Sequence, residues 1–192
     1  MAYLLFSHFG KLLTRVLNNR LNAWAEKYNV YVEAQAGFRK GMSTVANIFV
    51  LHAAISHFLN SNKKLFVAMI DYSKAYDYVV RDILWYKLIK YGIRGKILNI
   101  IKSMYSSLKT TIRVNGELSD SYTNVFGVAQ GECLSSFLFS IYLNDLEETL
   151  YLSGAEGIQL GMLSYSYFYM QMASSCLLKV KRVYITVLIY YI

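Results

Sequence analysis

Hydrophobic and polar positions follow different periods in different parts of the chain, which predicts a mixture of helices and short strands. Apolar residues that recur every three or four positions predict amphipathic helices, whereas apolar runs bounded by turn residues predict strands. The helical pattern covers about residues 9–27, 44–59, 79–90, 95–107 and 132–150. The strand pattern covers residues 65–70, and a hairpin of residues 110–114 and 121–126 is expected around the turn signal Asn115-Gly116. Strands mixed with pairs of helices predict an α+β domain.

Composition and charge narrow the class of protein. Of the 192 residues 55% are hydrophobic and 18 are Tyr, which predicts a real core and further apolar surface. The net charge of +8 favours an anionic partner such as a nucleic acid. The two cysteines lack metal-type spacing and fit a reducing compartment. No apolar run reaches the roughly 20 residues of a membrane span. We therefore expect no membrane partner and an intracellular location, nuclear or cytoplasmic.

The most informative segment is the apolar strand 65–70 with the carboxylate that follows it. Asp71 comes directly after the strand, and Tyr76 and Asp77 follow shortly after. A strand end presents a ligand rigidly, and a nucleotidyl transferase holds Mg²⁺ through hard oxygen ligands while substrate phosphates complete the coordination. An Asp after a strand also fits a simple turn or helix-cap residue. On this segment alone both interpretations of Asp71 stay open.

Several segments, in order along the chain, resemble the reverse transcriptase of non-LTR (LINE-like) retrotransposons, from about residue 6 to residue 159. Residues 9–21 resemble its first fingers helix, and Gln35-Ala-Gly-Phe-Arg-Lys-Gly-Met-Ser-Thr44 resembles its template-side loop. Asp71-Tyr-Ser-Lys-Ala-Tyr-Asp77 resembles the first metal motif of the palm, and Gln130-Gly-Glu-Cys-Leu-Ser-Ser-Phe-Leu-Phe139 the motif that shapes the nucleotide pocket. The resemblance implies the fingers and partial palm of a right-hand polymerase over residues 1–160, with the thumb absent.

The resemblance also implies roles for individual residues. Asp71 would bridge the two Mg²⁺ ions of the intact family, and Tyr76 would lie beneath the sugar of the incoming dNTP and exclude a ribose 2′-hydroxyl. Gln130 and Gly131 would line the nucleotide and template-base pocket. Arg39 would contact phosphates of the template or the triphosphate. The alternatives are a core Tyr76 and a solvated basic loop around Arg39. The implied partners are an RNA template, a DNA primer and dNTP, with the oligomeric state undefined.

The second metal motif of the family, a Tyr-Ala-Asp-Asp hairpin, is missing from the sequence. No Asp follows Asp145, and no acidic residue follows Glu156. In its place stands Phe-Tyr-Met-Gln-Met-Ala at residues 168–173, whose codons permit Leu-Tyr-Ala-Asp-Gly when read one frame out of register. We therefore expect a frameshift near residues 161–164. Residues 161–192 would then be an out-of-frame tail and not a domain, and a complete Mg²⁺ site is not expected.

Different functional classes remain in play. The first is an RNA-directed DNA polymerase fragment that is inactive as translated, which would make the chain a pseudogene fragment. The alternative is a non-catalytic basic remnant that binds nucleic acid. A further possibility is a chain without function that does not fold stably, because strand 65–70 would lose its main neighbours and leave an open apolar edge. Asp77 is interpreted throughout as a cap or scaffold residue and not as a metal ligand.

Overall fold

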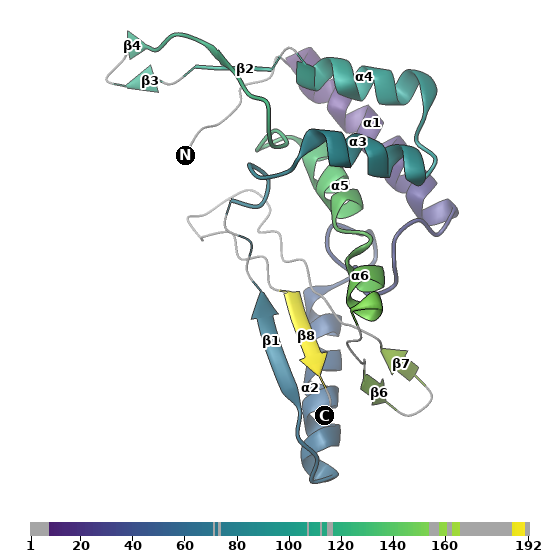
Figure 1. Ribbon diagram of the computed structural model, residues 1–192. Coiled ribbons are helices and arrows are strands. Elements are labelled where there is room, and N and C mark those ends of the chain that lie inside the picture. Colours follow the sequence, from purple (N-terminus) through teal and green to yellow (C-terminus); the bar gives the residue numbers. More distant parts are fainter. Residues whose placement is uncertain are drawn as a thin grey trace. The chain divides into compact units, whose positions relative to one another are not determined.

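The elements of the chain are seen in a computed structural model that describes residues 8–70, 72, 74–106, 108–111, 113–114, 117–153, 158–160, 163–165 and 186–190. The helices are α1 (His8–Lys27), α2 (Thr44–Asn60), α3 (Arg81–Lys90), α4 (Gly95–Ser106), α5 (Cys133–Tyr142) and α6 (Leu146–Leu152). The strands are β1 (Phe66–Ile70), β2 (Lys109–Thr110), β3 (Arg113–Val114), β4 (Glu117–Leu118), β5 (Tyr122–Thr123), β6 (Ile158–Leu160), β7 (Leu163–Tyr165) and β8 (Thr186–Tyr190) (Figure 1). This mixture of helices and short strands agrees with the expected α+β composition.

The chain divides into two compact units. The first consists of Met1–Val30 and Lys74–Tyr142, and the second of Tyr31–Ser73 and Leu143–Ile192. Each unit therefore draws on segments that are far apart in the sequence. The first contains α1, α3, α4, α5 and the strands β2 to β5, and the second contains α2, α6, β1, β6, β7 and β8.

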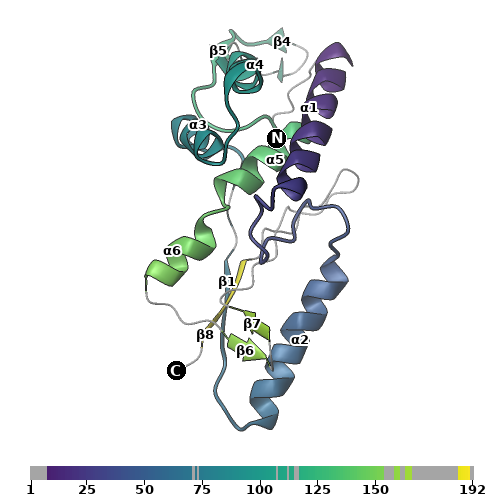
Figure 2. The same cartoon turned by 90° about the vertical axis from the view of Figure 1, so that its right-hand side faces the viewer.

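Helix α5 lies at the centre of the first unit, where it packs against α1 and α3 (Figure 2). Each of these helices buries a pair of leucines spaced four residues apart, so that one helical face enters the core. The pairs are Leu17 and Leu21 on α1, Leu84 and Leu88 on α3, and Leu134 and Leu138 on α5. Burial of a leucine contributes about 1.5–3 kcal/mol. The helical period seen in the sequence is therefore the period of this core.

The arm that follows α4 contains two short antiparallel ladders. Strand β2 pairs with β5, and β3 pairs with β4. The strands are shorter than the predicted hairpin of residues 110–114 and 121–126. Because both residues of β4 and both residues of β5 are exposed, no apolar face is buried that would extend the pairing. The predicted turn Asn115-Gly116 lies outside the described residues.

In the second unit, α2 starts where the sequence predicts. Ser43 is the N-cap, and its side-chain oxygen accepts a hydrogen bond from the Ala46 N–H at 3.1 Å. An N-cap bond of this kind contributes about 1 kcal/mol to a helix. The helix packs against β6, which forms an antiparallel ladder with β7.

Helix α2 is apolar on two faces. Ala54 and Phe58 are buried, whereas Val45, Phe49 and Leu59 are 71–73% exposed. The additional apolar surface that the composition predicted is thus present on this helix. None of the helices in the described part of the chain has an apolar stretch of the length that crossing a bilayer requires.

Strand β1 is paired, contrary to the expectation that it would lose its neighbours. Its five residues form an antiparallel ladder with β8, in a register that places Phe66 opposite Tyr190 and Ile70 opposite Thr186 (Figure 1). Residues 186–190 read Thr-Val-Leu-Ile-Tyr, a composition that favours strands, so they can satisfy the hydrogen-bonding groups along β1. The tail of the chain therefore supplies the neighbour that the sequence analysis did not foresee. Its proposed origin in a displaced reading frame stays a prediction.

The single helix predicted over residues 132–150 is wrong, because the structure has two. Helix α5 ends at Tyr142 and α6 begins at Leu146. Between them Asn144 is buried, and its Oδ1 accepts a hydrogen bond from the Val32 N–H at 3.2 Å. Asn favours such side-chain bonds to the backbone over a place inside a helix, and here the partner is 112 residues away.

Candidate functional site

The residues that the sequence assigned to a site are divided between the two units. Tyr76, Gln130 and Gly131 lie in the first unit, and Arg39 lies in the second. Asp71 lies outside the described residues, so its role as a metal ligand stays a prediction. Two loops of the first unit bring Tyr76 and Gln130 close together.

These loops are clamped by their backbones. The Val128 N–H donates to the Tyr76 carbonyl at 2.8 Å, and the Gly127 N–H donates to the Val79 carbonyl at 2.8 Å. Gly127 has a φ of +82°, and a Cβ at this position would lie 2.8 Å from the Tyr76 oxygen and 2.9 Å from the Asp77 oxygen. Because an atom other than hydrogen cannot fit there, only glycine allows the two loops to approach this closely.

The side chain of Gln130 bridges the same two loops. Its Nε2 donates a hydrogen bond to Oδ1 of Asp77 at 2.6 Å. A carboxylate only accepts hydrogen bonds, so the nitrogen of the amide must face it. The N–H of Asp77 donates in turn to the Lys74 carbonyl at 2.8 Å. This arrangement supports the interpretation of Asp77 as a scaffold residue.

Tyr76 and Gly131 differ in their surroundings. Tyr76 is only 7% exposed, and its ring packs edge to face against Phe139 of α5 with 5.2 Å between the centroids. This is the core packing that the sequence left open as an alternative to a sugar contact. Gly131 has a φ of +92°, and no atom lies within 4 Å of the place where a Cβ would stand. Open space therefore adjoins the backbone of Gly131.

Arg39 is held by its own loop. Its Nη1 donates to the carbonyl oxygens of Val32 at 3.3 Å and Gln35 at 3.2 Å. The guanidinium also lies over the ring of Tyr31, 5.2 Å from the centroid. Lys40, the next residue, is exposed. The basic loop is thus braced internally by the same arginine that the sequence assigned to phosphate contact.

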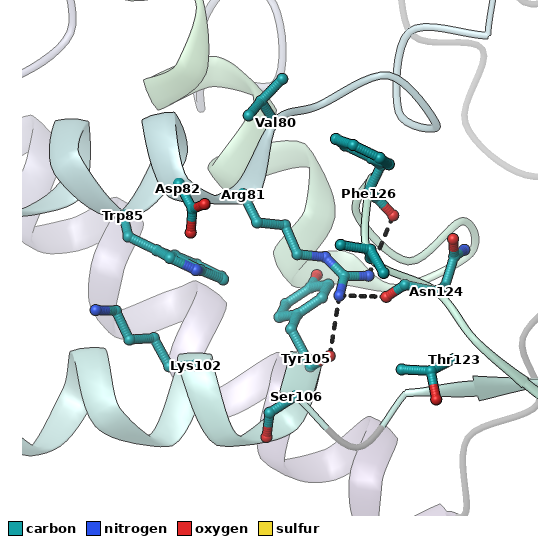
Figure 3. Close-up of a pocket in the computed structure, with 11 residues that line it drawn as sticks. Val80, Arg81, Asp82, Trp85, Lys102, Tyr105, Ser106, Thr123, Asn124 and Phe126 are labelled. Carbon is teal, nitrogen blue, oxygen red and sulfur yellow. Dashed lines mark hydrogen bonds between the residues drawn. The ribbon is translucent and has the colours of Figure 1, made fainter.

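Arg81 is a residue whose importance the sequence analysis missed. From the first turn of α3 its guanidinium donates to four backbone carbonyls, those of Gly127 (2.8 Å), Tyr105 (3.0 Å), Asn124 (2.6 Å) and Phe126 (3.2 Å). Figure 3 shows the bonds to Tyr105, Asn124 and Phe126. Partial burial lowers the pKa of Arg81, and the neighbouring Tyr105 opposes that shift. Arg81 therefore fastens the start of α3 and the end of α4 to the loop that carries Gly127.

A cavity of about 440 Å³ lies beside Arg81, and Trp85 and Lys102 also line it (Figure 3). The Trp85 ring is tilted against the ring of Tyr105 at 5.9 Å between centroids. Neither Gln130 nor Gly131 is among the lining residues. The cavity therefore does not include these two predicted site residues, although Val80 and Phe126, beside the clamp, help to line it.

Glu132 anchors the Gln-Gly turn to the core, and the sequence analysis did not single it out. The side chain is buried, and its Oε2 accepts a hydrogen bond from the Thr14 hydroxyl of α1 at 2.6 Å. Close by, the Tyr105 hydroxyl lies 3.4 Å from Oγ of Ser135, and burial raises the pKa of Tyr105. These buried polar contacts join the start of α5 to α1 through Glu132 and to α4 through Ser135.

Among the described residues, no group of three or more His, Cys, Asp or Glu side chains could hold a metal ion. The carboxylate of Asp77 is engaged by Gln130. Asp71, the metal ligand that the resemblance implies, lies outside the described residues.

Comparison with known proteins decides the family. The family model described as "Reverse transcriptase (RNA-dependent DNA polymerase)" matches residues 2–168. This chain belongs to the reverse transcriptase family. The matched range includes both clamped loops of the reverse transcriptase chain, the basic loop and Asp71, and it leaves out residues 169–192.

The relatives of this reverse transcriptase are polymerases of non-LTR retrotransposons, as the resemblance predicted. The chain is 34% identical over 141 residues to the "Retrovirus-related Pol polyprotein from type-1 retrotransposable element R2" of Popillia japonica. The aligned residues make up 73% of the chain and 19% of the relative. It is 30% identical over 142 residues to the "Probable RNA-directed DNA polymerase from transposon BS" of Drosophila melanogaster, covering 74% of the chain and 16% of the relative. The chain thus spans less than a fifth of the length of these relatives.

Proposed function

We propose that this chain is the fingers and partial palm of a retrotransposon reverse transcriptase that binds an RNA template, a DNA primer and dNTP but does not incorporate nucleotides. The observation that carries the proposal is the clamp between two sequence-distant loops, which joins the segment of Tyr76 and Asp77 to the segment that leads to Gln130. Membership of the reverse transcriptase family supplies the reaction class. In this proposal residues 1–160 are the polymerase part, and residues 161–192 are an out-of-frame tail.

The residues of the clamp have distinct roles in the proposal. Gln130 and the backbone at Gly131 bind the incoming nucleotide, because open space adjoins Gly131. Glycine adopts a positive φ readily, and its lack of a side chain lets a ligand approach the backbone closely. In the proposal Tyr76 keeps the role that the resemblance implies, beneath the sugar where it excludes a 2′-hydroxyl, with its largely buried side chain braced by Phe139. Arg39 contributes positive charge to the phosphates of the template or the triphosphate.

The missing carboxylates explain the proposed lack of incorporation. In an intact member of the family two Mg²⁺ ions would stabilise the charge on the transferred phosphate. The described residues contain no cluster of metal ligands, and the sequence has no acidic residue after Glu156. Asp71 alone cannot hold both ions. Without the ions, the free energy of the transition state rises by several kcal/mol, about as much as when a main electrostatic contact is removed. We therefore propose that the chemical step falls below detection.

A second candidate is a basic remnant that binds nucleic acid without recognising dNTP. The net charge of +8 favours it. The two candidates differ in one respect, since only the first binds dNTP more tightly when a matching template base is present.

Binding to an RNA–DNA heteroduplex tests both candidates. We expect the affinity to fall steeply as KCl rises, because bound phosphates release counterions when Lys and Arg replace them. Arg39→Ala should weaken binding about threefold to tenfold and reduce the salt slope by about 1. Lys40→Ala, on the adjacent exposed residue, is the matched control and should change the affinity by less than about twofold. Fluorescence anisotropy over a KCl series measures both quantities, and binding that is absent or insensitive to salt would contradict the proposal.

A further inference from the structure

We propose that Asp77 is a positioning residue that fixes the side chain of Gln130 for nucleotide binding. The inference rests on the proposed function, in which Gln130 contacts the nucleotide. It goes beyond that function because Asp77 itself touches neither substrate nor metal in this scheme. Its effect on binding passes entirely through the amide of Gln130.

The contact has the geometry of a strong orienting bond. The distance from Nε2 of Gln130 to Oδ1 of Asp77 is 2.6 Å, and a hydrogen bond to a charged acceptor is stronger than one between neutral groups. Because the carboxylate can only accept, it selects one of the two orientations of the amide. Nε2 is held toward Asp77, and Oε1 is directed to the other side. The bond therefore determines which atom of Gln130 a ligand would meet.

Asp77 is a suitable anchor because its own backbone is fixed. Its N–H closes a turn onto the Lys74 carbonyl at 2.8 Å, and Lys74 has a φ of +50°. On the other side, the Cα of Asp77 would lie 3.0 Å from a Cβ placed on Gly127, so the two loops touch there. The carboxylate thus projects from a segment held on both sides.

The energetic benefit comes from restricting Gln130 before a ligand arrives. A free Gln side chain loses rotamer entropy when it is fixed, and a bond made in the unliganded chain removes part of that cost from binding. The bond lies on an exposed part of the surface. It should therefore add little to the stability of the fold, and variants of Asp77 should remain folded.

The orientation of the amide is measured by NMR on the ¹⁵N-labelled full chain. In the wild type we expect one of the two side-chain N–H protons of Gln130 to exchange with solvent about fivefold more slowly than in Asp77→Ala. Asp77→Asn should preserve the slow exchange, because the Asn carbonyl oxygen can accept the same bond. Asp120→Ala, at another exposed Asp of the same unit, is the control and should have no effect. Equal exchange in the wild type and Asp77→Ala would overturn the proposal.

The consequence for the ligand is measured with fluorescent mant-dATP, bound to the chain on an RNA–DNA primer–template whose next template base is U. Asp77→Ala should raise the Kd about fivefold to tenfold, and Asp77→Asn should stay within about twofold of the wild type. Because Asp77 acts through Gln130, the double variant with Gln130→Ala should bind no more weakly than Gln130→Ala alone. Independent effects that multiply in the double variant would overturn the positioning role.

The outcomes separate this inference from the proposed function. If the wild type does not bind mant-dATP, the proposed function is contradicted. The exchange rates then decide the present inference by themselves: slow exchange lost in Asp77→Ala supports the positioning of Gln130, and unchanged exchange overturns it.

Discussion

Replacing Gly127 with Ala is expected to lower the free energy of unfolding by about 3 kcal/mol. Part of the cost is conformational, because a φ of +82° strains any residue with a Cβ by about 1–2 kcal/mol. The rest is steric, because the new Cβ would lie 2.8 Å from the Tyr76 oxygen and 2.9 Å from the Asp77 oxygen. Both neighbours are backbone atoms, so neither can move without displacing its loop. Urea unfolding followed by circular dichroism measures the change.

Gly131→Ala is the matched control for this substitution. Gly131 has a comparable φ of +92°, but nothing lies within 4 Å of the added Cβ. It should therefore carry only the conformational cost of about 1–2 kcal/mol. The difference between the two variants isolates the close approach of the loops. Equal destabilisation by Gly127→Ala and Gly131→Ala would show that the loops are not clamped as described.

Arg81→Ala should be the other large effect, with a loss of about 2–3 kcal/mol of unfolding free energy. The substitution removes four hydrogen bonds from a charged donor to backbone carbonyls. It leaves partly buried carbonyl oxygens without a donor, which is more costly than the loss of an average hydrogen bond. The start of α3 and the end of α4 would no longer be joined to the loop at Gly127.

Two further substitutions define the role of Arg81. Arg81→Lys keeps the charge but has no planar fork, so it should recover only part of the stability. Arg94→Ala removes an exposed arginine whose Nε makes a long bond of 3.4 Å to Ile89, and it should change stability by less than about 0.5 kcal/mol. Urea unfolding measures the free energy of unfolding of the three variants. A loss in Arg94→Ala as large as that in Arg81→Ala would contradict a specific role for Arg81.

The parts of the fold that could be predicted from sequence are those set by local periodicity. The leucine pairs at four-residue spacing mark the buried faces of α1, α3 and α5, and Ser43 marks the start of α2. These signals depend on residues that are near one another in the chain. The break between α5 and α6 has no such signal, because it depends on the bond between Asn144 and the distant Val32.

Like the fold, the candidate site could be predicted from the sequence only in part. The resemblance to the reverse transcriptase family singled out Tyr76, Gln130 and Gly131, and the structure brings the first two onto clamped loops. The role of Arg81 could not be found in this way, because its partners are backbone carbonyls and any sequence provides those. The need for glycine at Gly127 likewise depends on the loop of residues 76–79, which lies about fifty residues earlier in the chain.

The pairing of β1 with β8 shows a different limit of sequence reasoning. Strand formation by residues 186–190 follows from their composition, but the choice of partner does not. A strand edge accepts many apolar segments, because the hydrogen bonds involve backbone groups alone. A segment that we propose to be out of frame can therefore still pair with β1.

Incorporation of a labelled dNTP into a DNA primer on an RNA template, in the presence of Mg²⁺, tests the proposed function most directly. Binding of the same primer–template is measured in parallel, and an active reverse transcriptase serves as the positive control. We predict salt-sensitive binding by the wild-type chain without incorporation above background, and no change in this result in Asp71→Ala. Template-dependent incorporation by the wild type that Asp71→Ala abolishes would contradict the proposal that this reverse transcriptase lacks a complete metal site.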